Sequence, residues 1–175
     1  AGKKLAGTPV DVVFFGSWDS WFYAVDARTG QQKWRFHGGE DAVLHNQVGF
    51  QSSPAVVNGI VYTGCRDSNL YALDAATGAE KWRYNANGSW IISSPAVAAG
   101  KVIFGTSDSS LYVVADAATG KVVAQVQGNA YMFSSPAVAG SVVFTGILNG
   151  SLEARDLDSG ALLWEFQTDA SKRNA

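Results

Sequence analysis

The chain has 175 residues, of which 47% are hydrophobic and 16% charged, with a formal net charge of -2 and a pI near 5.6. Its 13 Lys and Arg residues are scattered, so the sequence gives no electrostatic support for a nucleic-acid partner. No apolar run approaches the roughly 18 residues typical of a membrane span, and the single cysteine, Cys65, excludes an internal disulfide and a multi-cysteine zinc site.

A repeated segment organises the sequence. Ser-Ser-Pro-Ala-Val begins at Ser52, Ser93 and Ser134, so its copies are 41 residues apart. Glycine and acidic positions recur around it in four units: Gly16, Gly64, Gly105 and Gly146; Asp19, Asp67, Asp108 and Asn149; and Asp26, Asp74, Asp116 and Asp156. Tandem periods of about 40 to 45 residues built from short strands are typical of propeller blades.

In chain order, the first unit covers approximately residues 8–36 and is short at its start. Seven residues separate Pro9 from Gly16, whereas ten separate Pro54 from Gly64. We therefore expect the innermost strand of this unit to be truncated or absent.

Residues 37–51 form an added loop between the first two units. The link from Trp34 to Pro54 is seven residues longer than the link from Trp82 to Pro95. Added loops often carry function, so this loop supplies candidate contacts to a ligand or partner, with loop-stabilising hydrogen bonds as the alternative. The candidates are His45, Asn46 and Gln47. A metal site would need three or four such groups to converge, and no fixed spacing enforces this, so we predict no metal.

The second unit, approximately residues 52–86, predicts four strands separated by turn residues. They are expected at Pro54–Val57, Ile60–Cys65, Leu70–Asp74 and Glu80–Tyr84. The third and fourth units, approximately residues 93–127 and 134–168, repeat this pattern. No segment has the apolar spacing of an amphipathic helix. The predicted fold is all-β, a partial or half propeller of about four blades, each a four-stranded antiparallel sheet.

Tryptophan recurs four residues after the last glycine of a unit, at Trp34, Trp82 and Trp164. An indole repeated once per blade on the outer strand would fill the space between neighbouring blades, so we expect a structural role for all three. The third unit has Ala124 at this position, which predicts a differently filled contact with the next blade. The residues that could compensate are Val122, Val123 and Val126.

Units of the form Gly-x-x-Asp-x-x-Leu-Tyr-Ala-Leu-Asp-x-x-Thr-Gly-x-x-x-Trp, best matched by Gly64 to Trp82, resemble the pyrroloquinoline-quinone (PQQ)-like propeller repeat. The resemblance covers nearly all of residues 1–175 as one domain. In that family the tryptophans resemble a docking motif between blades, and a chain usually closes seven or eight blades. The resemblance thus implies three alternatives: further blades from a longer chain, further blades from a second copy, or closure of four blades alone.

Propeller topology predicts which residues converge, because the links between blades share one face of the disc with the hairpins between second and third strands. We expect this face, near the central channel, to bind a protein or a small-molecule ligand. Its candidate contact residues are Phe50, Trp90, Tyr131, Asp67 and Asp108.

The resemblance is to a functionally mixed family, which includes quinone-dependent dehydrogenases, the non-enzymatic BamB-like propeller and sensor domains. Its dehydrogenases resemble one another in an adjacent-cysteine disulfide and a calcium site, and this chain has one cysteine. We therefore predict a non-enzymatic binding scaffold with no catalytic residues and no cofactor, in the periplasm or otherwise outside the cytoplasm by resemblance alone. A fragment of a PQQ-dependent alcohol or sugar dehydrogenase, with PQQ and calcium, is the first alternative, and an extracytoplasmic sensor domain is the second.

Overall fold

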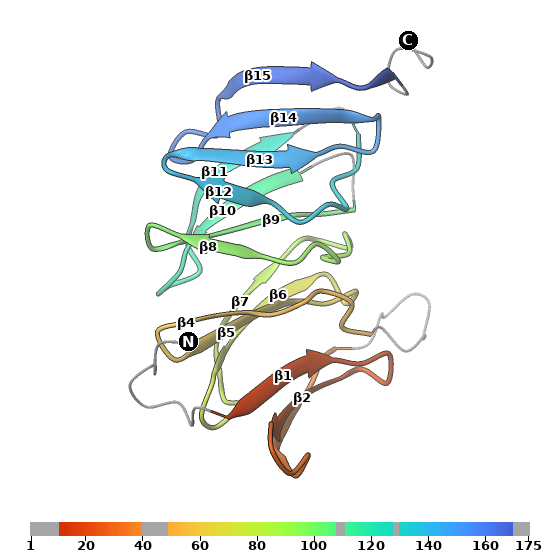
Figure 1. The fold of residues 1–175 in the computed structure, drawn as a ribbon, viewed down its shortest axis with the longest axis vertical. Coiled ribbons are helices and arrows are strands. Elements are labelled where there is room, and N and C mark those ends of the chain that lie inside the picture. Colours follow the sequence, from red (N-terminus) through yellow and green to blue (C-terminus); the bar gives the residue numbers. More distant parts are fainter. Residues whose placement is uncertain (1–10, 40–48, 108–110, 128–129, 170–175) are drawn as a thin grey trace.

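The computed structural model describes residues 11–39, 49–107, 111–127 and 130–169, and these form four antiparallel sheets (Figure 1). Blade 1 contains β1 (Val12–Gly16), β2 (Trp21–Asp26) and β3 (Gln32–His37). Blade 2 contains β4 (Ala55–Val57), β5 (Ile60–Gly64), β6 (Asn69–Asp74) and β7 (Glu80–Asn85). Blade 3 contains β8 (Ala96–Ala98), β9 (Lys101–Gly105), β10 (Leu111–Asp116) and β11 (Val122–Gln127). Blade 4 contains β12 (Ala137–Ala139), β13 (Val142–Gly146), β14 (Ser151–Asp156) and β15 (Leu162–Gln167).

Strands within each blade follow one another in sequence order, as a meander. The predicted all-β propeller class is confirmed, and the four predicted strands of blade 2 are placed within a residue or so of their expected ends. In blade 1 the described residues provide three strands, and the segment expected to hold its innermost strand begins outside the described residues.

The blades are stacked in chain order, with blade 1 and blade 4 at opposite ends of the long axis (Figure 1). This arrangement is an open array. The predicted alternative in which these four blades close into a ring by themselves is therefore wrong.

One turn recurs in all four blades and explains the acidic and glycine positions that follow the third strand of each unit. In blade 2, Asp74 Oδ1 accepts hydrogen bonds from the backbone N–H groups of Ala76 and Thr77 and from the Thr77 hydroxyl, at 3.0 to 3.1 Å. The glycine that ends the turn, Gly78, has φ of +75°, a conformation that glycine adopts without steric cost. These turns orient the outermost strand of each blade.

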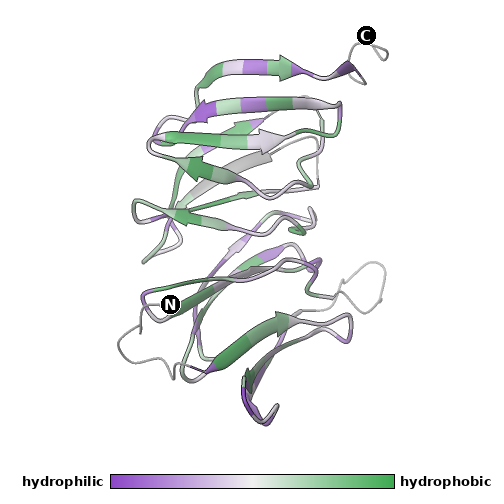
Figure 2. Cartoon of the chain, viewed as in Figure 1, coloured by the Kyte–Doolittle hydropathy of each residue, from purple (hydrophilic) through white to green (hydrophobic). Residues whose placement is uncertain are grey.

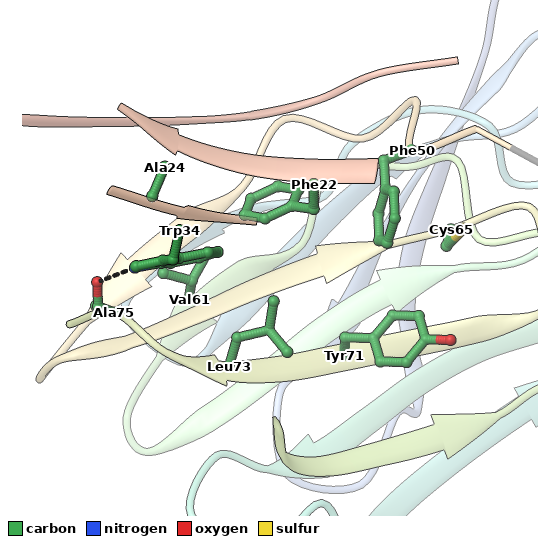
Figure 3. Close-up of a cluster of buried hydrophobic side chains, with 9 residues drawn as sticks. All are labelled: Phe22, Ala24, Trp34, Phe50, Val61, Cys65, Tyr71, Leu73 and Ala75. Carbon is green, nitrogen blue, oxygen red and sulfur yellow. Dashed lines mark hydrogen bonds between the residues drawn. The ribbon is translucent and has the colours of Figure 1, made fainter. Parts of the chain in front are cut away.

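Buried side chains gather between neighbouring blades, and Figure 2 shows apolar residues along the strands. We call the interface between two neighbouring blades a seam, and number the seams first, second and third from the N-terminus. The first seam holds Phe22, Trp34, Phe50, Tyr71 and Leu73, among others (Figure 3). Because both faces of the inner blades are buried, each blade depends on its neighbours for its core.

Trp34 and Trp82 occupy equivalent places in the first two seams. Trp34 is 9% exposed, and its Nε1 donates to the carbonyl of Ala75 in the next blade at 3.1 Å (Figure 3). A Cβ on Gly78 would lie 2.7 Å from the Trp34 ring, so this glycine provides the seat for the indole. In the second seam, Trp82 Nε1 donates to Ala117 at 3.2 Å, and its ring covers Gly120 in the same way.

The third seam is built differently, as Ala124 predicts. Leu157, buried at 3% exposure, occupies the position that Ala75 and Ala117 hold in the other seams, and packs in one cluster with Ala124. The expected compensation by valine is met only by Val126, which packs in this cluster. Val122 packs in the cluster of the second seam, and Val123 is 49% exposed. The structure thus adds bulk on blade 4 where blade 3 has lost an indole.

An ion pair is also buried on the face of blade 4 that lies toward blade 3. Arg155 Nε donates to Glu153 Oε2 at 2.7 Å, and both side chains are less than 10% exposed. Arg155 Nη1 donates to the carbonyl of Gly160 at 3.0 Å, in the turn equivalent to the one that Trp34 covers. At the equivalent positions, blade 2 has the buried residues Tyr71 and Leu73.

Candidate functional site on the loop face

The serines of the repeated Ser-Ser-Pro segment fix the innermost strands. Ser52 Oγ accepts from the Gly64 N–H at 2.7 Å and donates to its carbonyl at 3.0 Å, and Ser93 makes the same pair with Gly105. The second serine links neighbouring blades, because the backbone N–H of Ser53 donates to Ser94 Oγ at 2.8 Å. Sequence reasoning found these serines as a repeat but missed their role.

The links between blades lie against the hairpins between second and third strands, and together they form one surface that we call the loop face. The backbone N–H of Phe50 donates to the Ser17 carbonyl of blade 1 at 3.0 Å, and the Arg66 N–H of blade 2 donates to the Gly49 carbonyl at 3.3 Å. The same two bonds recur at the next two links. Their donor and acceptor pairs are Ile91 to Cys65, Ser107 to Trp90, Met132 to Thr106 and Leu148 to Tyr131.

The structure corrects the grouping of Phe50 with Trp90 and Tyr131. Phe50 lies two residues before its Ser-Ser-Pro segment, whereas the other two lie three residues before theirs. The true equivalents of Phe50 are Ile91 and Met132, and all three are at most 3% exposed. Because neighbouring residues of an extended chain point to opposite sides, the shift of one residue places Phe50 in the core. Its side chain is therefore not available to a ligand.

Trp18, Arg66 and Trp90 form one half of a group on the loop face in which Trp18 is exposed and the other two are half-buried. The Arg66 guanidinium lies 3.9 Å from the Trp90 ring centre and 5.2 Å from the Trp18 ring centre. Such cation–π contacts hold the guanidinium plane against the rings. Arg66 Nε is buried and has no hydrogen-bond partner within the described residues. Trp18 is 55% exposed and lies close against Gly49, where a Cβ would be 2.7 Å from the Trp18 Cα.

Tyr131, Phe133 and Leu148 form the other half. The Tyr131 and Phe133 rings stack with centres 5.6 Å apart, and all three residues are between 39% and 60% exposed. Because the recurring backbone bonds run from link to hairpin across the blades, the two halves follow one another along the loop face. We call the six residues the aromatic arc: Trp18, Arg66, Trp90, Tyr131, Phe133 and Leu148.

Sequence reasoning found Trp90 and Tyr131 but missed the other members of the arc. A signal was present, since the second residue after the repeated glycine varies from Trp18 to Arg66, Ser107 and Leu148 while its surroundings stay constant. A variable position in a constant hairpin indicates a surface that does not serve the repeat itself.

The carboxylate of Asp67, a predicted contact residue, is engaged within the protein. Asp67 Oδ1 accepts from the Asn69 N–H at 3.0 Å, and Oδ2 accepts from the Gly39 N–H at 2.6 Å and from the Tyr71 hydroxyl at 2.5 Å. It ties the link after blade 1 to the hairpin of blade 2. The other predicted contacts, His45, Asn46, Gln47 and Asp108, lie outside the described residues.

Cys65 is fully buried beside this hairpin, and burial raises the pKa of its thiol. The thiolate is the reactive form of cysteine, so Cys65 stays a neutral filler rather than a nucleophile. Among the described residues, no group of three or more His, Cys, Asp or Glu side chains could hold a metal ion. In the same part of the chain, no helix has the length and apolar character needed to cross a membrane.

Comparisons with solved structures support this fold. The quinohemoprotein alcohol dehydrogenase ADHIIG from Pseudomonas putida HK5 is 23% identical with a TM-score of 0.78, over 93% of this chain and 33% of that chain. BamB from Moraxella catarrhalis is 18% identical with a TM-score of 0.74, over 90% of this chain and 49% of that protein. The computationally designed Ika8 protein is 19% identical with a TM-score of 0.74, over 90% of this chain and 46% of the designed one. This chain therefore spans between a third and a half of the length of these proteins.

No curated protein matches the sequence. A family model described as "Outer membrane protein assembly factor BamB" matches residues 19–175, which is most of the chain. The chain therefore belongs to this BamB-like family of PQQ-like β-propeller repeat proteins.

Proposed function

We propose that the chain is a non-enzymatic scaffold that binds a protein partner through the aromatic arc of its loop face. The observation that carries the proposal is the arc itself, in which a half-buried arginine lies between two indoles and further exposed apolar side chains continue the surface. Trp, Tyr and Arg are the residues most enriched among those that dominate binding at protein interfaces.

A preorganised surface of this kind favours binding, because little side-chain freedom is lost when a partner docks. Arg66 is held by two rings and by the backbone bond from its N–H to Gly49, and the linked hairpins set the spacing between neighbouring members of the arc. The matching family is described by its part in outer membrane protein assembly, which supports a protein partner and a periplasmic location for this chain.

The first alternative, a PQQ-dependent dehydrogenase, would require oxygen ligands for calcium near the channel. Calcium takes six to eight oxygen ligands, mostly carboxylates and carbonyls. Asp67 has both carboxylate oxygens engaged by backbone and tyrosine donors. The engagement of Asp67 within the protein therefore favours the scaffold over a calcium and quinone site at this hairpin, and we derive no reaction step through such a site.

Site-specific photocrosslinking in the source cells tests the proposal. Crosslinking amino acids at positions 18 and 148 should capture the same protein, because both positions belong to the arc. Position 123 on β11 is the matched control, since Val123 is 49% exposed but lies on an outer strand. The variant Trp90→Ala should reduce the crosslinks from position 148 without changing the circular dichroism spectrum. Equal capture from positions 18, 148 and 123 would contradict the proposal, as would quinone binding with a defined stoichiometry in the presence of calcium.

A further inference from the structure

Arg66 is the charged member of the aromatic arc, and both blades next to its own contribute to its surroundings. It lies in the hairpin between β5 and β6 of blade 2. Its N–H is bonded to Gly49 in the link from blade 1, and its guanidinium contacts Trp90 in the link to blade 3. Trp90 is itself fixed, because its N–H donates to Ser107 Oγ at 2.8 Å and its carbonyl accepts from the Ser107 N–H at 3.0 Å. Arg66 is therefore held in place from two sides.

Arg66 has no carboxylate partner within the described part of the chain. The other cationic side chains of that part that are buried or half-buried are both paired. Lys101 Nζ lies 2.8 Å from Asp158 Oδ1, and Arg155 Nε lies 2.7 Å from Glu153 Oε2. Arg66 is half-buried as well, but its side chain contacts two indole rings, which attract a cation without accepting its hydrogen bonds as a carboxylate does. A partly desolvated charge without a counter-ion is costly, so this site favours a ligand that brings one.

Asp67, the acid next to Arg66 in the sequence, is committed elsewhere. Its Oδ1 accepts from the Asn69 N–H, and its Oδ2 accepts from the Gly39 N–H and the Tyr71 hydroxyl. The net charge of -2 gives the chain no general excess of positive charge that would attract acids. A preference of the arc for an acidic group would therefore come from Arg66 itself.

The orientation of Arg66 decides which of its donors reach a partner. Nε is buried against the protein, so the guanidinium can meet a partner only through its two Nη nitrogens. These nitrogens can donate two hydrogen bonds to the two oxygens of one carboxylate. A guanidinium is weakly hydrated, and the rings beside it fix its plane before binding. The Nη edge therefore suits a carboxylate that arrives together with apolar groups that cover the indoles.

We propose that the protein partner binds Arg66 through the carboxylate of an Asp or Glu side chain that has apolar residues on both sides of it in the partner's sequence. Trp18 of blade 1 and Trp90 of the link to blade 3 both contact the guanidinium, so a segment that crosses the arc meets an indole before and after Arg66. An internal acidic residue fits this order, whereas a C-terminal carboxylate would end the segment at Arg66. The inference rests on the proposed function and names the chemistry of the partner.

Selection from a random library of short peptides displayed on phage tests this chemistry. The peptides are fused to the coat protein at their C-terminal end, so their acidic groups are side chains. The target is the full 175-residue chain, and counter-selection on Trp90→Ala removes peptides that bind outside the arc without selecting for charge. We expect the remaining peptides to share one Asp or Glu with apolar residues on both sides.

Synthetic versions of the selected peptides measure the contribution of the acid. Replacing the shared acid by its amide should weaken binding by about 10-fold or more, because the partly desolvated pair loses one charge. Arg66→Gln should weaken binding of the acidic peptide by a similar factor and should bind both peptides alike, since the two charges act as a pair. Arg35→Gln is the matched control, because the Arg35 guanidinium also lies on an indole, 4.0 Å from the Trp21 ring centre, but outside the arc. It should leave both affinities unchanged.

Three results would overturn the inference. Peptides that depend on Trp90 but share no acid would show that Arg66 needs no carboxylate from a partner or that an acid of the chain already serves it. Equal binding of the acidic peptide and its amide would show that the charge contributes nothing. A selection that yields no peptide dependent on Trp90 would also contradict an acidic segment as the ligand. The scaffold proposal is judged separately, by the crosslinks from positions 18 and 148.

Discussion

The first and third seams join blades of the same repeat with different chemistry. In the first seam, the Trp34 indole fills the space, with Ala75 and Gly78 leaving room for it. In the third seam, Ala124 replaces the indole, Leu157 replaces the alanine, and the Arg155 side chain reaches the carbonyl of the seat glycine. The comparison shows that the repeat specifies the backbone frame, while the residues on both sides of each seam fill it together. A change on one blade is therefore matched on the next.

Removing the indole from the first seam should have the largest effect. Trp34→Ala should lower the free energy of unfolding by about 3–5 kcal/mol, because it leaves a cavity and the Ala75 carbonyl without its donor. Urea unfolding of the monomer at low protein concentration measures the change. Trp164→Ala is the control, and in the monomer it should change stability by less than about 0.5 kcal/mol because the side chain is exposed. Similar losses for both variants would contradict the contrast between the buried Trp34 indole and the exposed Trp164 indole.

Breaking the ion pair of the third seam should come next. Glu153→Leu should cost about 3 kcal/mol, because it leaves the buried Arg155 guanidinium without its carboxylate. The double variant Glu153→Tyr, Arg155→Leu copies blade 2 and should recover most of this loss, since an apolar pair needs no compensating charge. The measurement is again urea unfolding. A double variant no more stable than Glu153→Leu would contradict this expectation, and would show that an unpaired Arg155 costs the seam no more than its replacement does.

Introducing the first seam's tryptophan into the third seam tests whether the side chains at positions 124 and 157 share one space. Ala124→Trp alone should destabilise by about 1–3 kcal/mol, because Leu157 already occupies part of the space. Adding Leu157→Ala should restore stability relative to Ala124→Trp alone. Additive losses in this double-mutant cycle would show that the two positions do not share one space.

A smaller contrast concerns one threonine position. Thr145 Oγ1 is buried and has no hydrogen-bond partner within the described residues, whereas Thr63 Oγ1, at the equivalent position in blade 2, lies 3.1 Å from Ser52 Oγ. Thr145→Val should therefore stabilise by about 1 kcal/mol, since it removes an unsatisfied buried hydroxyl. Thr63→Val should destabilise by a similar amount. Thermal unfolding of the two variants measures the difference, and a loss of stability in both would indicate that Thr145 has a partner.

The smallest expected effect is a pH dependence shared by all blades. Hydrogen bonds from Thr29, Lys81 and their equivalents hold the pKa values of Asp26, Asp74, Asp116 and Asp156 below the usual range. A lowered folded-state pKa stabilises the protein above the unfolded value of about 3.9, and this contribution is lost as the pH falls through the folded pKa. Stability should thus decrease below about pH 4, and Asp74→Asn should make this decrease less steep. An unchanged pH profile would argue against a role for this turn.

Much of the fold follows from the repeat, and much of the candidate site does not. The four-stranded blades, the turn at Asp74 and the altered third seam were all predicted from repeated positions. Phe50 was grouped with Trp90 and Tyr131 because the added loop obscures the alignment of the first link with the other two. The resulting shift of one residue decides whether the side chain lies in the core or on the surface. Arg66 and Trp18 were missed because they meet across the boundary between two blades, and repeat positions alone do not show which neighbours face each other.

The sequence by itself determined the strand order, the turns and their glycines, because these depend on local backbone conformation repeated in each unit. Only the tertiary structure decided which side chains share a seam, that Leu157 and Arg155 occupy the place left by Ala124, and that Trp34 is buried whereas Trp164 is 47% exposed. The physical reason is that packing joins residues from neighbouring blades, and their distances are fixed only once the blades are stacked.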